Sequence, residues 1–183
     1  MSEAGTQVGI ARLRASTVAP LRSVDEGTVR AALAEVPDPE LPMLSVIDLG
    51  IVHRVGVASG DGPIHVEILP TFVGCPALEL IKASIADRLA TFGRQVEVVA
   101  TFEVPWTSDR ITPHGRLALE AAGIAPPGEP LAGANLIALE PRVPCPHCGS
   151  RDTVLENLFG PTQCRTIRFC RACRQPFEAI KPV

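Results

Sequence analysis

Two pairs of cysteines in the last 40 residues constrain the fold of this chain more than any other feature. Each pair has the spacing C-x-x-C, Cys145 with Cys148 and Cys170 with Cys173, and 21 residues separate the pairs. A two-residue spacer brings both sulfur atoms within bonding distance of one metal, about 2.3 Å for zinc. Because a segment of about 40 residues seldom buries enough apolar surface to fold alone, we expect a metal to hold this tail together.

The two pairs lie about one β-hairpin apart, so the four cysteines predict a structural Zn²⁺ in a zinc ribbon. Two other uses of the same thiols stay open, namely disulfides and a redox-active iron site. The chain has no 18-residue apolar run and no signal-peptide pattern at its start. We therefore expect it in the cytoplasm, where thiols stay reduced and clustered cysteines favour metal over disulfides.

Cys164 lies between the two pairs and is not needed to complete a set of four ligands. It is either a half-buried strand cysteine or an additional, exchangeable thiol used in metal transfer. His147 stands inside the first pair, and we expect it to point outward rather than to replace a cysteine.

The charges of the chain are spread unevenly around a net charge of −3. Residues 1–141 carry ten Lys and Arg against 17 Asp and Glu, whereas residues 142–183 carry seven against three. A phosphate-rich partner would have to meet the tail, and four thiolates with a divalent metal would reduce the positive excess there. We therefore expect neither nucleic acid nor a membrane as a partner.

The residues before the tail follow the order helix, strand, strand, helix, strand, helix. The first helix opens at Ser23-Val24-Asp25-Glu26, which has the capping-box pattern. The strands are expected over residues 51–57, 64–69 and 96–102, the first two joined by a Gly-Asp-Gly turn, and the later helices over residues 77–89 and from Thr112-Pro113 to Gly123. This order predicts an α+β domain whose helices pack on a small mixed sheet.

The domain organisation follows from these patterns and from the prolines near the tail. We expect a flexible N-terminal arm over residues 1–20, the α+β domain over 21–124, a Pro-rich linker over 125–144 and the zinc ribbon, a β-hairpin module, over 145–183.

Cys75 is the one cysteine outside the tail, and it stands in the heptad PTFVGCP. A strand pattern ends before it and a helix pattern begins after it, which places Cys75 at a helix N-terminus. There, free N–H groups and the positive end of the helix dipole lower the pKa of a thiol. This environment suits a reactive or metal-binding sulfur, and a buried, inert cysteine is the alternative. The residues supply no recognisable general base for a nucleophilic enzyme.

Two further side chains are candidates for the same site. Asp48 is a carboxylate set among apolar residues, so it is either bound by backbone donors in a loop or part of a site. Trp106 precedes the last helix and is placed to close over the same edge of the sheet.

Three segments resemble the metal-sulfur cluster biosynthesis proteins, whose small α+β domain occurs in iron-sulfur assembly factors. They read DPELPMLSVIDLGIVHRV, LPTFVGCPALELI and VPWTSDRITPHGRLALEAAGIAPP. With the tail motifs CPHCGS, FGPTQC and CRACRQPFE, the chain is most similar to one family of proteins in the bacterial phenylacetyl-CoA epoxidase (oxygenase) system. The resemblance covers nearly the whole chain after residue 20.

This resemblance implies roles for three residues. Cys75 matches the family's characteristic cysteine, Thr71 matches the threonine four residues before it, and Asp48 matches the acid of its D-L-G motif. Cys75 would then be the reactive thiol that binds iron or an iron-sulfur cluster transiently, supported by Asp48 and Thr71.

The resemblance also implies a function in aerobic phenylacetate catabolism. The chain would be an accessory or maturation subunit, not catalytic by itself. It would help iron or iron-sulfur centres reach its partners, the di-iron oxygenase and the iron-sulfur reductase of the epoxidase. The alternative is a structural or electron-transfer subunit of the oxygenase with a metal-loaded ribbon.

Overall fold

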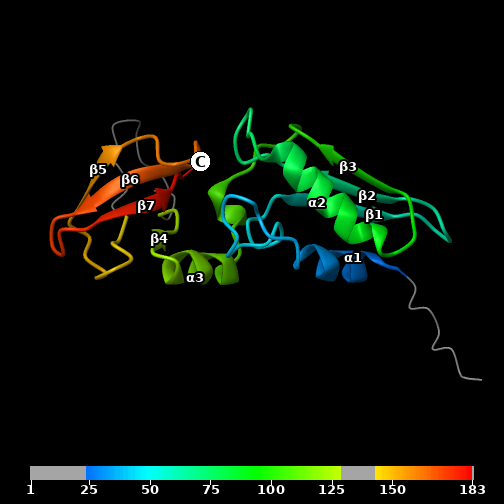
Figure 1. Cartoon of the computed structure of the whole chain (residues 1–183), viewed down its shortest axis with the longest axis horizontal. Coiled ribbons are helices and arrows are strands. Elements are labelled where there is room, and N and C mark those ends of the chain that lie inside the picture. The colour runs from blue at the N-terminus through cyan, green and yellow to red at the C-terminus, as the bar shows by residue number, and fades with distance from the viewer. Residues whose placement is uncertain (1–23, 129–142, 183) are drawn as a thin grey trace, which may run out of the picture.

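The protein structure is a computed structural model that describes residues 24–128 and 143–182. It contains two groups of elements, one around a three-stranded sheet and one around a four-stranded sheet (Figure 1). The helix and strand order predicted for the first group is confirmed. The predicted N-terminal arm and most of the predicted linker lie outside the described residues.

The first sheet is mixed, as predicted, with the strand order β1-β2-β3. β1 (Val52–Val57) and β2 (Ile64–Ile68) form an antiparallel hairpin. β2 runs parallel to β3 (Val96–Ala100), because helix α2 (Leu78–Ala90) connects these two strands. The crossover through α2 places the loop before this helix at the end of β2.

The core lies between one face of this sheet and the helices. Alternate residues of β2, namely Ile64, Val66 and Ile68, are fully buried and share a cluster with the apolar side of α2. On the opposite face of the sheet His65 is exposed, and its Nε2 lies 2.7 Å from Glu97. The sheet therefore buries one face and leaves the other open to solvent.

Helix α1 (Glu26–Leu33) packs against α2 and β1. Its N-cap is Asp25, whose Oδ1 accepts a 2.7 Å hydrogen bond from the backbone N–H of Thr28. The capping box predicted from Ser23 is therefore not the cap that the structure uses, and Ser23 itself lies outside the described residues. A carboxylate at the N-cap satisfies the free N–H groups and the dipole together.

The last helix of the first group begins as predicted. A short 3₁₀ turn, η1 (Ser108–Arg110), leads into α3 (Pro113–Ala121), and the Thr112 hydroxyl caps this helix by accepting from the N–H of Gly115 at 3.0 Å. Gly123 then turns the chain with a positive φ of 77°.

The second sheet has the strand order β4-β7-β6-β5. It is larger than the predicted hairpin, because β5 (Thr153–Asn157), β6 (Arg165–Cys170) and β7 (Pro176–Ile180) form three antiparallel strands. β4 (Ile124–Ala125) adds to this sheet by pairing parallel with β7. Residues that the sequence divided between the first domain and the linker thus extend the ribbon sheet.

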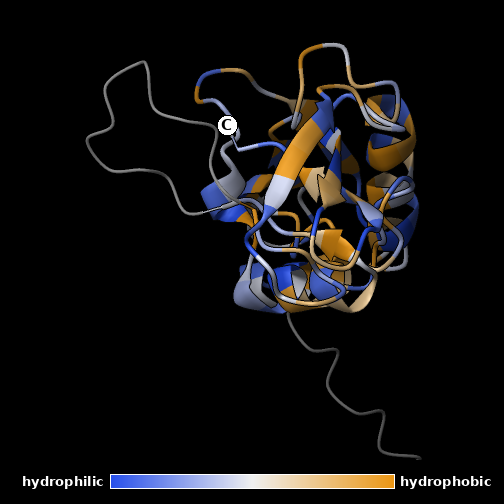
Figure 2. Cartoon of the chain, turned by 90° about the vertical axis from the view of Figure 1, so that its left-hand side faces the viewer, coloured by the Kyte–Doolittle hydropathy of each residue, from blue (hydrophilic) through white to orange (hydrophobic). Residues whose placement is uncertain are grey.

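The two groups share a core, to which β4 contributes Ile124 and β7 contributes Ile180. Ile180, the last residue of β7, is 2% exposed and belongs to the same buried cluster as the first sheet. Figure 2 views the molecule from the ribbon side, where hydrophobic and hydrophilic residues alternate along the strands. The ribbon is therefore packed onto the α+β domain.

Within the two described ranges, no helix has both the length and the apolar character that crossing a membrane requires.

Candidate functional site

The four paired cysteines of the tail converge, as the sequence predicted. Their sulfur atoms all lie within 4.8 Å of one another. The Sγ atoms of Cys145 and Cys173 are 3.7 Å apart, and those of Cys148 and Cys170 are 3.6 Å apart. A tetrahedral ion with bonds of about 2.3 Å to sulfur requires sulfur pairs about 3.8 Å apart. The donor set therefore fits a four-thiolate metal centre.

The pKa values of these thiols also favour a cation at the centre of the four sulfur atoms. A hydrogen bond from the backbone N–H of Cys173 lowers the pKa of Cys170 to about 7. Burial and the hydrogen bond to Cys170 raise the pKa of Cys173 to about 12. Thiols at this spacing cannot all ionise unless a positive charge compensates them. A bound divalent ion would supply that charge. In this tail the ion would also have a structural role.

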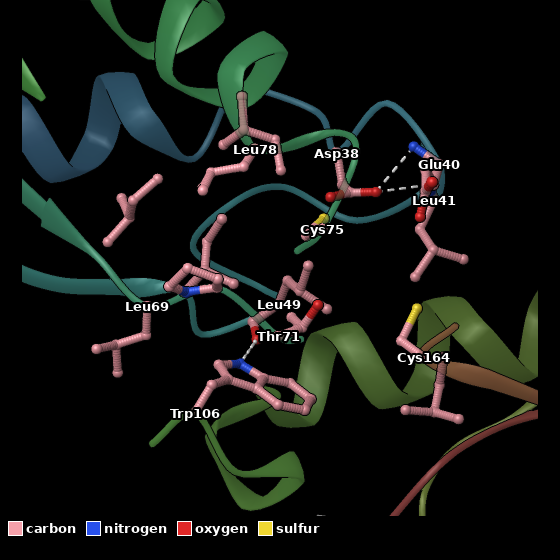
Figure 3. Close-up of a pocket in the computed structure, with 15 residues that line it drawn as sticks. Asp38, Glu40, Leu41, Leu49, Leu69, Thr71, Cys75, Leu78, Trp106 and Cys164 are labelled. Carbon is pink, nitrogen blue, oxygen red and sulfur yellow. Dashed lines mark hydrogen bonds between the residues drawn. The ribbon is translucent and has the colours of Figure 1, made fainter. Parts of the chain in front are cut away.

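Cys75 lines a small pocket between the two groups of elements (Figure 3). The pocket has a volume of about 30 Å³. This is room for an ion or a few water molecules, whereas pockets for organic ligands measure about 300 Å³ or more. Its wall is mostly apolar, with contributions from the ends of β1 and β2, from α2 and from the ribbon. The pocket therefore suits a ligand as small as a single ion.

Cys75 does not lie at the N-cap of α2. The helix begins at Leu78 with Ala77 as its N-cap, and Cys75 belongs to the turn before it. Burial raises the pKa of the Cys75 thiol, the backbone N–H of Ala77 opposes this effect, and the charges of Glu40 and Asp38 add to it. The prediction of a lowered pKa at Cys75 is therefore wrong, because desolvation and negative neighbours outweigh the helix end.

Two acidic residues of the pocket were not identified from the sequence. Asp38 and Glu40 lie in the Pro-rich loop DPELP after α1, and both line the pocket with Cys75. Asp38 is only 5% exposed, and its Oδ1 accepts hydrogen bonds from the N–H groups of Glu40 at 2.9 Å and Leu41 at 2.8 Å. An aspartate between two prolines was the available signal, but only the tertiary fold brings this loop to Cys75.

Thr71 and Trp106 also line this pocket, as the sequence predicted for the tryptophan. The indole N–H of Trp106 donates a 2.9 Å hydrogen bond to the carbonyl of Leu49, and the ring is 6% exposed (Figure 3). Trp106 therefore closes the pocket from the side opposite to α2.

Asp48 lies outside the lining of this pocket. Its Oδ2 accepts from the Ser45 hydroxyl at 2.7 Å, while its Oδ1 accepts from the Thr112 hydroxyl at 2.9 Å and lies 3.0 Å from Nδ1 of His114. Burial by itself would raise the pKa of Asp48, but hydrogen bonds from Ser45, His114 and Thr112 outweigh it and hold the pKa below its usual value. Asp48 ties the loop before β1 to the start of α3.

The rest of the D-L-G motif serves the same junction. Gly50 has a φ of +70°, and a Cβ at this position would collide with the backbone carbonyl of Arg110. The guanidinium Nε of Arg110 in turn donates to the carbonyl of Gly50 at 3.1 Å. The motif therefore packs the segment that leads into β1 against the segment that carries Trp106, and its Leu49 lines the pocket.

Cys164 does not join the four-cysteine cluster. It is half-buried just before β6, its Sγ lies 3.1 Å from the Thr162 hydroxyl, and it lines the same pocket as Cys75. Burial raises the pKa of the Cys164 thiol. The interpretation of Cys164 as a half-buried cysteine agrees with its burial, and Figure 3 shows its side chain at the pocket that Cys75 also lines.

Comparison with known proteins shows two family matches along the chain. Residues 26–100 match the family described as "Iron-sulfur cluster assembly protein", and residues 132–181 match the family described as "PaaD zinc beta ribbon domain". The ribbon match includes all four clustered cysteines and Cys164, whereas the first match includes Cys75.

Two curated proteins illustrate these similarities. The chain is 38% identical, over 92% of its length and 98% of the other chain, to the putative D component of the 1,2-phenylacetyl-CoA epoxidase of Escherichia coli (strain K12). It is 31% identical, over 50% of its length and 89% of the other chain, to the "Fe-S protein maturation auxiliary factor YitW" of Bacillus subtilis (strain 168).

Solved structures resemble part of the chain. A protein from Bacillus anthracis, described as a domain of unknown function, superposes with a TM-score of 0.48 at 27% identity over 51% of this chain and 90% of its own.

Proposed function

We propose that this chain, which belongs to the PaaD family of phenylacetyl-CoA epoxidase components, is an accessory factor that helps iron or iron-sulfur centres reach other subunits of that epoxidase through Cys75. One part of the chain matches an iron-sulfur cluster assembly family, and the other matches a zinc ribbon family. The zinc ribbon would hold a structural Zn²⁺. The clients would be the oxygenase or the reductase subunit in the cytoplasm.

The observation that carries this proposal is the pocket around Cys75. Its volume of about 30 Å³ suits a metal ion and not an acyl-CoA substrate. Its polar side chains are thiols, a threonine hydroxyl and the carboxylates of Asp38 and Glu40, while no histidine lines it among the described residues. Thiols and carboxylates are side chains that bind metals.

The ionisation of Cys75 supports a binding role as well. A thiol whose pKa is raised by burial stays protonated near neutral pH, so it is a poor free nucleophile. A metal cation displaces this proton, because the ligand form of cysteine is the thiolate. The Cys75 thiol therefore stays protonated until a cation binds.

The loop that carries Cys75 offers a surface for a client. Phe72 is 41% exposed and Val73 is 79% exposed, although both side chains are apolar. We propose that these two neighbouring apolar side chains are part of the contact with a client. A client docked on these two residues would lie next to the sulfur that delivers the metal.

Replacement of Cys75 by Ser in cells tests the proposal. A strain lacking the chain is complemented with the wild type, with Cys75→Ser, or with Asp87→Asn as a control at an exposed position of α2. We expect Cys75→Ser to accumulate as folded protein while both epoxidase activity and the iron content of the purified oxygenase and reductase fall. Full activity and full iron content in the Cys75→Ser strain would contradict the proposal.

Metal analysis of the purified chain separates the proposal from an electron-transfer role. About one zinc per chain without visible absorption supports a structural ribbon. Iron in the ribbon with charge-transfer bands would instead support an electron-transfer function.

A further inference from the structure

The pocket of Cys75 lies where the two domains meet, and each domain supplies a thiol to it. Cys75 comes from the turn before α2, and Cys164 comes from the residue before β6 of the ribbon (Figure 3). Ile180 at the end of β7 lines the same pocket and belongs to the shared core. The ribbon is therefore held against the pocket by packing, and its thiol lines the same pocket as Cys75 as a result of the fold.

A buried carboxylate, that of Asp38, lines the same pocket as the two thiols and keeps one oxygen available. Oδ1 of Asp38 accepts from the N–H groups of Glu40 and Leu41, whereas Oδ2 accepts no hydrogen bond from any residue in the described parts of the chain. The same parts contain no fully buried side-chain oxygen without a partner, so Oδ2 keeps contact with open space. We infer that this space is the pocket, because Asp38 lines the pocket and is only 5% exposed.

The ionisable groups that line the pocket are acidic, so a bound cation would compensate their negative charge. The carboxylates of Asp38 and Glu40 line the pocket together with the thiols of Cys75 and Cys164. Arg165 is the cation that acts on Asp38 and Cys164, but its Nη1 is already paired with Glu178 at 2.7 Å. A divalent ion would supply the missing positive charge while it displaces the protons.

We propose that Cys75, Cys164 and Asp38 are ligands of a second metal site, which takes one thiophilic divalent ion of the Fe²⁺ class and joins the two domains. This inference rests on the proposed function, because the ion would be the cargo that Cys75 delivers. Two thiolates with a carboxylate are a donor set for Fe²⁺, Co²⁺ or Zn²⁺ rather than for Mg²⁺ or Ca²⁺. Glu40 lies in the same pocket and can complete four ligands.

This site differs from the ribbon centre in being open. In the described parts of the chain, only the four ribbon cysteines have their ligand atoms gathered within 4.8 Å. Cys75, Cys164 and Asp38 line a cavity that must close on an ion by side-chain rotation and small movements of the exposed loop around Gly74. A site that assembles only around its ion binds more weakly than a preformed one, as release of cargo requires.

Anaerobic titration of the full chain with Co²⁺ tests the proposal, with the chain as purified and its ribbon metal in place. We expect one additional cobalt per chain with thiolate-to-metal absorption, while the ribbon metal is retained. Cys75→Ser and Cys164→Ser should each weaken this binding about tenfold or more, since loss of even an outer-shell partner costs about 10- to 100-fold. Asp38→Asn keeps Oδ1 for the loop and should also weaken it, whereas Glu120→Gln at an exposed position should not. Wild-type affinity in Cys164→Ser would overturn the proposal.

A second measurement needs no variant and so does not depend on the folding of one. In the wild-type chain, Co²⁺ should protect Cys75 and Cys164 from iodoacetamide at the same cobalt concentration. Protection of Cys75 alone would show that the ribbon thiol is not a ligand.

The complementation assay separates this inference from the proposed function. If Cys164→Ser restores activity and client iron while Cys75→Ser does not, the two-thiol site is wrong and the delivery role of Cys75 stands. If both variants restore them, both proposals fail. If neither does, both are supported.

Discussion

Replacing Asp48 by Asn tests whether the acid of the D-L-G motif holds the fold together rather than serving Cys75 directly. The substitution keeps the shape of the side chain but removes its charge, and it turns an amide NH₂ toward donors. The carboxylate accepts from the hydroxyls of Ser45 and Thr112 and faces Nδ1 of His114, and it is 17% exposed. Hydrogen bonds to a charged group contribute about 1.5–3 kcal/mol each when buried, so with partial exposure we expect a net loss of about 2 kcal/mol.

The pH dependence of this loss has a definite sign. Because the folded-state pKa of Asp48 lies below its usual value, its contribution to stability is present above the unfolded-state pKa, about 3.9, and disappears as the pH falls through the folded-state value. The difference between wild type and Asp48→Asn should therefore be largest near neutral pH and shrink in acid. Metal release in acid affects both proteins alike, since they share the same cysteines.

Urea unfolding and thermal melting between pH 3 and 7 measure the difference. At pH 7 the melting temperature should fall by about 4–8 °C, since about 1 kcal/mol corresponds to about 2–4 °C in a chain of this size. Asp87→Asn, at an exposed position of α2, is the matched control and should change little. A stability difference that persists unchanged at pH 3, or that is absent at pH 7, would refute the assigned role of Asp48.

Three further outcomes follow from the structure. Gly50→Ala should destabilise the protein by about 2 kcal/mol or more, since a Cβ there meets the Arg110 carbonyl. Gly74 has a similar φ of +81° but open space around it, so Gly74→Ala should cost about 1 kcal/mol. Equal urea midpoints for the two variants would contradict this difference. Removal of the ribbon metal by a chelator should expose the amides of β6 to hydrogen exchange, with earlier release at lower pH because protons compete for the thiolates, and unchanged protection would argue against a structural metal. Alkylation of Cys75 by iodoacetamide should have its pH midpoint above that of a free cysteine, about 8.5, because burial and the facing groups Asp38, Glu40 and Cys164 disfavour the thiolate; a midpoint below that of a free cysteine would reject this environment.

Local patterns were sufficient for most of the secondary structure. The strands of the first sheet and the start of α3 at Thr112-Pro113 follow from alternation and from capping, which act within a few residues. The first cap was placed two residues early, because Ser23 and Asp25 both suit that position and only the formed helix selects one. β4 was missed because a two-residue strand has no pattern of its own and exists only where β7 offers it an edge.

The four-cysteine centre was determined by the sequence by itself, because the geometry of one tetrahedral ion is encoded in the spacing of two short pairs. The surroundings of Cys75 were decided only by the tertiary structure. Its pKa depends on burial and on Asp38 and Glu40, which come from a distant loop. The placement of Cys164 in the same pocket as Cys75, 89 residues earlier in the chain, depends on how the ribbon packs on the shared core. Desolvation and charge proximity are properties of the packed molecule, and no spacing along the chain records them.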